Sequence, residues 1–229
     1  MRRRNGDPFI FVIVLSAVAI FAIVSYLVRK ARSKQRAEDL QQVANELGLS
    51  FSPWGGDELV SQLGWSALVS RGRSKTILNL MRSSNADREV AVFDYQYVTG
   101  HGKSRRTVVT TVACLRSDGP PLPGFSLRPE GTWDKISGWF GRADIDFDTH
   151  PKFSRSYVLN GQSESAVRAL FTPSVLDHCE QFTGISVDGL DHTVVLYRLG
   201  KSVPAAAIKQ FLTDAFELLS ILHGSALAR

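Results

Sequence analysis

Three aspartates and a histidine form the sequence's clearest candidate for chemistry. Asp144, Asp146 and Asp148 alternate with apolar residues, and His150 follows them. On an extended strand the three carboxylates would share one face, about 7 Å apart in succession. Carboxylates with an imidazole could hold a divalent cation, although the EF-hand pattern fails because Thr149 stands where glycine is required. The alternative is a half-buried strand whose acidic face pairs with arginines or caps turns.

The segment Gly102-Lys103-Ser104 resembles the end of a phosphate-binding loop. The full pattern requires glycine five residues before Gly102, where Tyr97 stands, and a helix after the serine. Residues 105–116 are instead rich in valine and threonine, which favours a strand. These features exclude a nucleotide site of this kind.

The remaining nucleophiles and metal ligands show no recognisable spacing. Cys114 and Cys179 are the two cysteines, so neither a C-x-x-C pair nor a clustered zinc site is indicated. No G-x-S-x-G motif occurs. The five histidines are scattered: His101, His150, His178, His192 and His223. No cofactor is predicted.

A series of strand-forming segments precedes the aspartates. Residues 66–70, 75–81, 89–98 and 105–116 are strand candidates separated by turn compositions of hairpin length. The simplest interpretation is an antiparallel meander. Alternate turns of a meander fall at the same end of the sheet, which would bring together the basic residues of two turns. These residues are Arg71, Arg73, Lys75, His101, Lys103, Arg105 and Arg106.

This predicted basic sheet edge is a candidate anion site for lipid headgroups or for an acidic protein partner. A basic group beside an anionic leaflet contributes about 1 kcal/mol. The alternative is a pair of solvated turns, which are commonly charged.

The second half of the chain adds strands and helices. Residues 125–128 and 153–159 are strand candidates, 164–170 and 173–182 are helix candidates, and 185–187 with 193–198 predict a hairpin. A C-terminal helix begins near Pro204, ends at Gly224 and carries one apolar stripe: Ile208, Phe211, Leu212, Ala215, Leu218, Leu219 and Leu222. These elements predict an α+β fold. The aromatic segment Trp133, Ile136, Trp139 and Phe140 would pack on the core or lie at a membrane interface.

The N-terminus carries a stretch typical of a membrane anchor. Phe9 to Val28 is an uncharged run of 20 residues, which predicts a transmembrane helix rather than a cleaved signal peptide. Residues 1–8 flank it, residues 29–48 form a basic segment with an amphipathic helix over 35–48, and residues 49–229 form the globular domain. Five basic residues follow the run and three precede it, which favours a cytosolic domain.

The charge distribution narrows the class of partner. Residues 1–36 hold 8 of the 27 basic residues and 1 of the 22 acidic ones, which leaves 19 basic and 21 acidic residues in the remainder. The pI of about 9.4 therefore reflects the flanks of the anchor, Arg36 included. A near-neutral globular domain argues against nucleic-acid binding.

Several motifs together resemble a group of uncharacterised bacterial membrane-anchored proteins. They are Phe93-Asp94-Tyr95-Gln96-Tyr97, Thr99-Gly100-His101-Gly102-Lys103, Arg106-Thr107, Leu127-Arg128-Pro129-Glu130, Asp144-Ile145-Asp146-Phe147 and Pro151-Lys152-Phe153-Ser154. The resemblance implies a bacterial inner-membrane setting with one soluble domain. It implies no activity and no functional residues.

The favoured interpretation is a non-enzymatic, membrane-tethered module. Its expected partners are the lipid bilayer and a membrane protein, reached through the basic sheet edge. The alternative is a membrane-bound, metal-dependent hydrolase that uses Asp144, Asp146, Asp148 and His150. A third possibility is an envelope assembly protein with the domain outside the cytosol.

Overall fold

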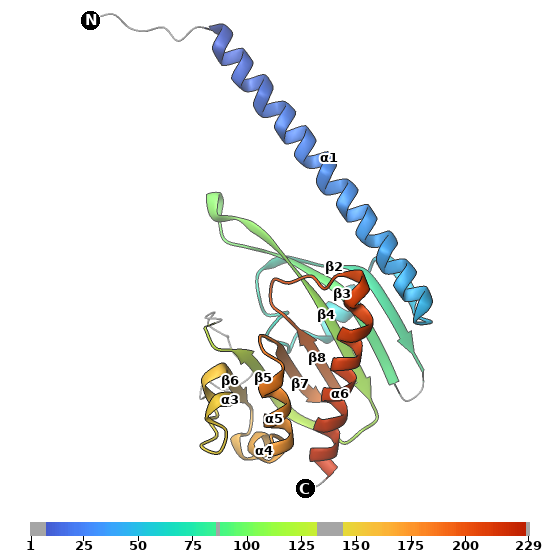
Figure 1. Cartoon of the computed structure of the whole chain (residues 1–229), viewed down its shortest axis with the longest axis vertical. Helices are drawn as coiled ribbons and strands as arrows, with labels where there is room; N and C mark the ends of the chain where they lie inside the picture. Colours follow the sequence, from blue (N-terminus) through green and yellow to red (C-terminus); the bar gives the residue numbers. More distant parts are fainter. Residues whose placement is uncertain (1–7, 86–87, 132–143, 228–229) are drawn as a thin grey trace, which may run out of the picture.

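The computed structural model describes residues 8–85, 88–131 and 144–227, and one long helix rises from a mixed α and β domain (Figure 1). The helices are α1 (Pro8–Glu46), α2 (Asp57–Gln62), α3 (Pro151–Ser156), α4 (Glu164–Leu170), α5 (Pro173–Gln181) and α6 (Ile208–Leu227), with short 3-10 turns η1 (Gly102–Ser104) and η2 (Ala205–Ala207). The strands are β1 (Ser50–Trp54), β2 (Arg73–Ser84), β3 (Arg88–Thr99), β4 (Arg106–Ser117), β5 (Leu122–Pro129), β6 (Tyr157–Gly161), β7 (Ser186–Asp191) and β8 (Thr193–Tyr197).

All eight of these strands belong to one antiparallel sheet. Their order across the sheet is β1-β2-β3-β4-β8-β7-β5-β6. The first four strands are neighbours in sequence order, so the predicted meander and the α+β class are confirmed. The predicted hairpin of 185–187 with 193–198 is also present as β7 and β8.

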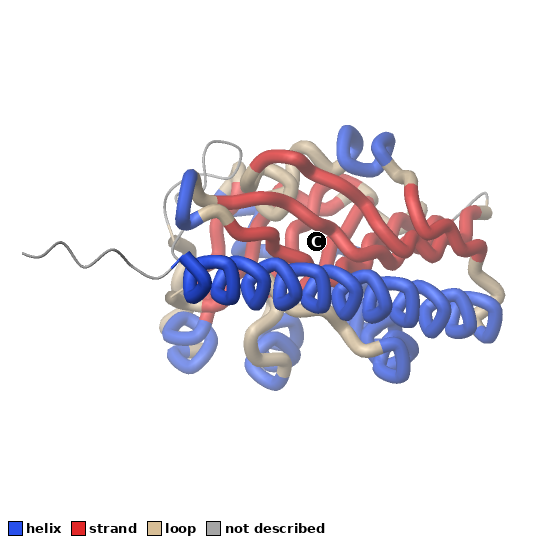
Figure 2. Tube along the Cα trace, turned by 90° about the horizontal axis from the view of Figure 1, so that it is seen from above, coloured by secondary structure: helices blue, strands red, loops and turns tan. Residues whose placement is uncertain are grey.

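The sheet buries apolar side chains on both faces because residues alternate along each strand. Val92 and Ala113 face a core that includes α1, α5 and α6 residues. Ala91, Phe93 and Val112 face the opposite core, beneath α2 and the segment that follows it. Figure 2 shows most helices along one side of the sheet. The predicted stripe of the C-terminal helix is buried in full against the first of these faces.

Two strand predictions are wrong. Residues 66–70 form turns that cover the sheet. The Ser66 hydroxyl and the backbone N–H groups that follow it bond the side chain of Asp188 on β7, so this segment does not pair with the sheet as a strand. Residues 153–156 belong to α3, which Pro151 starts, so only residues from Tyr157 onward form strand. The first strand, β1, was not predicted. The aromatic segment Trp133, Ile136, Trp139 and Phe140 lies outside the described residues.

Helix α1 joins two segments that the sequence predicts separately. It runs without a break from the apolar stretch through the amphipathic stretch and ends before Gly48, whose φ of 68° lies in the left-handed region. Leu40 and Ala44 are buried against the domain, as their spacing predicts. Among the residues that the structure describes, no helix combines the length and apolar character needed to cross a membrane, so the predicted transmembrane helix over 9–28 is not supported.

Candidate functional site

The two basic turns lie at the same end of the sheet. Arg73 at the start of β2 is the cross-strand partner of Val98, and Thr99 at the end of β3 is the partner of Arg106 at the start of β4. The meander topology thus brings together the turns that contain Arg71, Arg73 and Lys75 and those that contain His101, Lys103, Arg105 and Arg106.

Glycine and serine shape the tip of the β3–β4 hairpin. Gly100 has φ 73°, and a Cβ there would lie 2.3 Å from the Ser104 carbonyl oxygen, so a larger residue does not fit. The Ser104 hydroxyl donates to the His101 carbonyl (2.8 Å) and accepts from the His101 N–H (3.2 Å). The turn therefore uses its serine internally, and β4 follows it where a phosphate-binding loop would require a helix.

Most cations at this end are open to solvent. Arg73, His101, Lys103, Arg105 and Arg106 are exposed. Across the described ranges, the ion pairs involve other cations, and no Asp or Glu occurs in the sequence from residue 95 to residue 117. We call Arg73, His101, Lys103, Arg105 and Arg106 the basic end. It forms an exposed positive surface.

Two predicted members of this surface are oriented differently. Lys75 is half-buried. Arg71 is also half-buried and lies close enough to Tyr197 and Arg128 to influence their pKa values. Arg71 therefore belongs in part to a buried polar cluster under the 66–71 segment.

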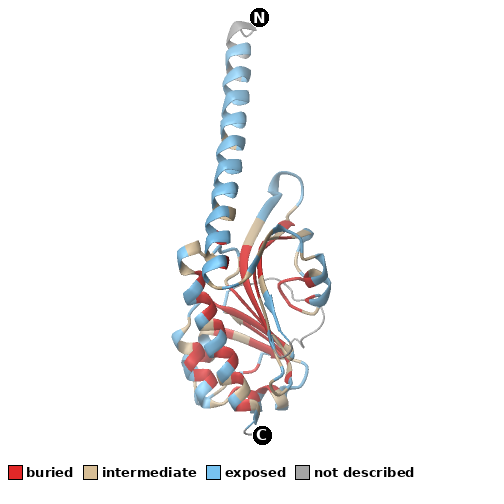
Figure 3. Cartoon of the chain, turned by 90° about the vertical axis from the view of Figure 1, so that its right-hand side faces the viewer, coloured by how far each residue is buried: buried red, intermediate tan, exposed pale blue. Residues whose placement is uncertain are grey.

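The N-terminal half of α1 rises from the same end of the domain as the β3–β4 hairpin. Both views of the chain show the hairpin tip extending in the direction taken by the helix (Figures 1 and 3). Eleven large apolar side chains between Val12 and Val28 are exposed, and Phe21 retains 74% of its accessible surface. We call residues 12–28 the apolar arm. Four exposed cations follow it: Arg29, Lys30, Arg32 and Lys34.

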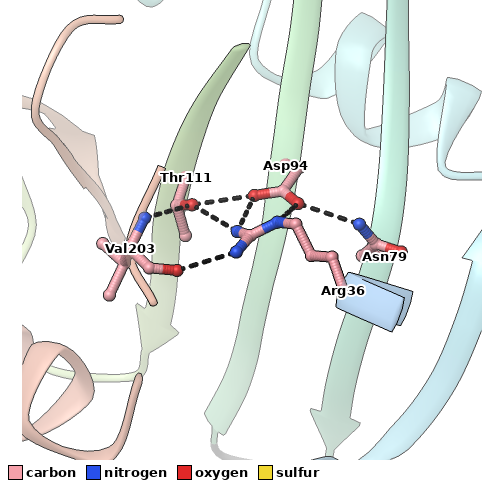
Figure 4. Close-up of polar contacts among 5 residues, drawn as sticks. All are labelled: Arg36, Asn79, Asp94, Thr111 and Val203. Carbon is pink, nitrogen blue, oxygen red and sulfur yellow. Dashed lines mark hydrogen bonds and ion pairs between the residues drawn. The ribbon is translucent and has the colours of Figure 1, made fainter. Parts of the chain in front are cut away.

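An ion pair that is largely buried fixes α1 to the sheet two residues after the last of these cations, between Arg36 and Asp94 (Figure 4). The Arg36 guanidinium donates from Nε and Nη2 to the two carboxylate oxygens of Asp94, each at 2.7 Å. The Arg36 Nη1 also donates to the Val203 carbonyl oxygen at 3.0 Å. Asp94 is only 2% exposed. Arg36, which sequence reasoning assigned to the basic flank of the anchor, is therefore a structural residue of the domain.

The neighbours of Asp94 complete its hydrogen bonds. The Asn79 side-chain amide donates to Oδ2 (2.9 Å), and the Thr111 hydroxyl donates to Oδ1 (2.7 Å). Thr111 in turn accepts from the Val203 N–H (2.9 Å). Asn79 has φ 52° inside β2, where the register with β3 shifts. This irregular backbone places the amide on the carboxylate. The sequence signal for the site is the aspartate within the apolar run of β3.

A second buried carboxylate anchors the segment between α2 and β2. Asp188 on β7 accepts from the hydroxyls of Ser66 (2.5 Å) and Ser126 (2.6 Å). Burial raises the pKa of Asp188, and these two hydroxyls together with the N–H groups of Leu68 and Ala67 oppose that rise. The bonds attach residues 66–68 to the sheet and thereby position the turn that leads into Arg73.

The structure does not gather the predicted metal ligands. Asp144 accepts from the Leu159 N–H (2.8 Å) and so extends the edge of β6. Desolvation by burial is the main cause of a raised pKa at Asp144. Asp146 and Asp148 are exposed, and the Asp146 carbonyl accepts from Arg168.

The fourth predicted ligand has other partners. The His150 Nε2 lies 3.4 Å from an Asp177 oxygen, and its Nδ1 lies 2.9 Å from the Thr149 hydroxyl. Ile145 is buried and donates its N–H to the Leu159 carbonyl oxygen of β6 (2.8 Å), whereas its acidic neighbours are exposed, as the alternation predicts. Within the described ranges, no three His, Cys, Asp or Glu side chains are grouped as a metal site would require.

Comparison with known proteins shows a shared fold. No family model matches the chain, and no curated protein matches its sequence. The crystal structure of the mycobacterial trehalose monomycolate transport factor A, TtfA, superposes with a TM-score of 0.57 at 11% sequence identity. The match covers 82% of this chain and 93% of TtfA. At this identity the likeness to TtfA establishes the fold alone.

Proposed function

We propose that the protein is a membrane-tethered interaction module. The apolar arm inserts into a lipid bilayer, and the basic end faces the anionic headgroups of the same bilayer. The observation that carries the proposal is that the hairpin tip extends in the direction taken by α1 (Figure 1), while exposed cations follow the arm along that helix.

The exposure of the apolar arm supports a lipid environment. Burying a Val, Leu, Ile or Phe side chain contributes about 1.5–3 kcal/mol, so the eleven exposed side chains leave on the order of 15 kcal/mol unrealised in water. These side chains lie all around the helix rather than along one stripe. A single partner helix would cover one stripe, whereas lipid covers every face.

The positions of the cations support contact with an anionic membrane surface. Arg29, Lys30, Arg32 and Lys34 follow the arm directly, and Lys103 and Arg105 stand at the hairpin tip. Each basic group held near an anionic leaflet adds about 1 kcal/mol, and this attraction falls off within a Debye length. We place the domain on the cytosolic face of the bacterial inner membrane, where this excess of cations is favoured.

The likeness to TtfA is consistent with this placement. TtfA is described as a transport factor for trehalose monomycolate, which is a lipid. A domain of the same fold held against a membrane would be positioned to act beside lipid or beside a membrane protein.

The first experiment tests the arm. The full chain is expressed in bacteria, and its membrane fraction is washed with high salt and then with alkaline carbonate. We expect the wild-type chain to stay in the pellet and the double variant Val18→Asp/Phe21→Asp to be extracted. Trp54→Asp is the matched control, because Trp54 is an equally exposed apolar residue (71%) on the domain. Extraction of the wild-type chain by carbonate would refute insertion.

The second experiment tests the basic end. A fluorophore on His101→Cys is quenched by lipids that carry a nitroxide headgroup, in nanodiscs with and without phosphatidylserine. We expect anionic lipid to increase the quenching at residue 101 but not at a Ser84→Cys label on the opposite end of β2.

Charge variants supply the control for this second experiment. Lys103→Gln/Arg105→Gln should abolish the increase, whereas Arg88→Gln/Arg116→Gln, at the other end of the same hairpin, should not. Equal quenching by neutral and anionic lipid would show that the basic end does not face the headgroups. A reporter fused to the C-terminus tests the cytosolic assignment separately.

A further inference from the structure

The outer edge of β4 is incompletely paired. Strand β8 pairs with residues 112–116 of β4, and the Thr111 N–H donates to the Lys201 carbonyl at 3.0 Å. Nearer the tip, residues 106–109 pair with β3 on one side. In the part of the chain that the structure describes, no strand pairs with their other side.

The direction of Thr111 identifies the free backbone groups. Its N–H points away from β3, toward Lys201. Because backbone groups alternate in direction along a strand, the N–H and C=O of Thr107 and Val109 point the same way. Thr107 is exposed and Val109 is half-buried. Among the described residues, none of these four groups has a backbone hydrogen-bond partner, so they form a short row of donors and acceptors of the kind that an added strand requires.

The surrounding charges specify the chemistry of the occupant. Arg105 and Arg106 stand at one end of the free edge and Lys201 at the other, without an acidic residue between positions 95 and 117. We propose that residues 106–109 of β4 bind an extended, acidic segment of a partner protein by strand addition. Pairing with a second copy of this chain would instead bring the two sets of cations together.

The outermost strands of the sheet are protected in ways that this edge is not. Strand β1 carries Pro53, which cannot donate to a ladder. Strand β6 is covered by the segment at Asp144 and Ile145, which exchanges hydrogen bonds with Leu159. Residues 106–109 lack both devices, and their valine and threonine side chains favour strand pairing.

The test uses the full chain in a neutral detergent, so it does not depend on the membrane proposal. The probe is a fluorescein-labelled octapeptide of alternating Glu and Val, measured by anisotropy. Thr107→Pro removes one outward N–H without changing charge, and an edge strand accommodates proline there. Thr107→Val is the matched control. We expect saturable binding that weakens at least about fivefold in Thr107→Pro and is unchanged in Thr107→Val.

Two further measurements distinguish strand pairing from attraction between charges alone. A peptide N-methylated at alternate residues should bind at least about fivefold more weakly, since it cannot complete the ladder. If Thr107→Pro fails to fold, hydrogen exchange of the wild-type chain decides: the peptide should slow exchange at Thr107 and Val109 but not at Lys103. If no saturable binding is seen, the proposal is wrong and the cations only keep other strands away from this edge. If the N-methylated peptide binds equally well, the cations attract the acidic peptide without strand pairing, which also refutes the proposal.

Discussion

Removing the Arg36 guanidinium should destabilise the domain strongly. In Arg36→Met, Asp94 would keep its bonds from Asn79 and Thr111 but lose both charged bonds while only 2% exposed. Breaking a buried ion pair at one partner costs about 3–5 kcal/mol. The Arg36 side chain is 25% exposed, so we expect the lower end, about 3 kcal/mol. For a chain of this size that corresponds to a fall in Tm of roughly 6–12 °C.

The assay is a double-mutant cycle on the full chain in a neutral detergent. Unfolding by urea and by heat is measured for wild type, Arg36→Met, Asp94→Asn and the double variant. Once Arg36 is absent, replacing Asp94 with neutral asparagine removes the unpaired charge. The double variant should therefore be more stable than the sum of the single losses implies, with a coupling of about 2 kcal/mol.

Two results would refute this reasoning. The first is a loss below about 1 kcal/mol in Arg36→Met, which would place the pair among exposed ion pairs. The second is additivity of the two losses within about 0.5 kcal/mol, which would show that the residues act independently. Gln35→Met is the control, since Gln35 is the exposed neighbour on the same helix and bonds only within it, to Asp39.

Three other predictions follow from packing and burial. Gly189→Ala should destabilise the chain by about 1–3 kcal/mol in urea unfolding, because its Cβ would lie 2.3 Å from the Phe125 ring, whereas Gly224→Ala, with open space around it, should be neutral or stabilising. Burial raises the pKa of Asp188, so the folded state holds that proton more tightly and the free energy of unfolding should fall as pH rises above about 4. The variant Asp188→Asn should lack this component. Equal slopes of the free energy of unfolding against pH in wild type and variant would contradict the prediction. Burial raises the pKa of Cys114 and of Cys179 to about 12 each, so a thiol reagent at pH 8 should label neither in the folded chain and both after unfolding; rapid labelling of the native chain would be inconsistent with their burial.

Elements with a strong local pattern could be predicted from the sequence. The stripe from Ile208 to Leu222 repeats with helical spacing over several turns and is buried as expected. Helix α4 has the predicted bounds, Glu164–Leu170, and the Ser163 side chain caps it. The turn compositions between the strands were enough to predict the meander. The order of strands in the meander then places the two basic turns at one end of the sheet.

Features that depend on distant residues could not be predicted. Residues 66–70 have strand-forming composition, but the buried Asp188, more than a hundred positions away, holds the segment as turns. Strand β1 was obscured by Pro53 and by Gly55 and Gly56, which favour a loop in sequence but follow a short edge strand. The four predicted metal ligands are close in sequence, yet they do not converge: Asp144 bonds the Leu159 N–H, His150 lies beside Asp177, and Asp146 and Asp148 are exposed.

Arg36 links the two halves of the proposed surface. It sits in the same unbroken helix as the apolar arm, and its ion pair with Asp94 lies on β3, the strand that continues to the hairpin tip. A helix fixed at that point cannot shift along the sheet by one turn without leaving Asp94 buried and unpaired. The direction in which the arm leaves the domain is therefore set by contacts within the domain. The ion pair thus gives the buried Asp94 a structural role within the apolar part of β3, and if the arm inserts as proposed, one fixed face of the domain would meet the membrane.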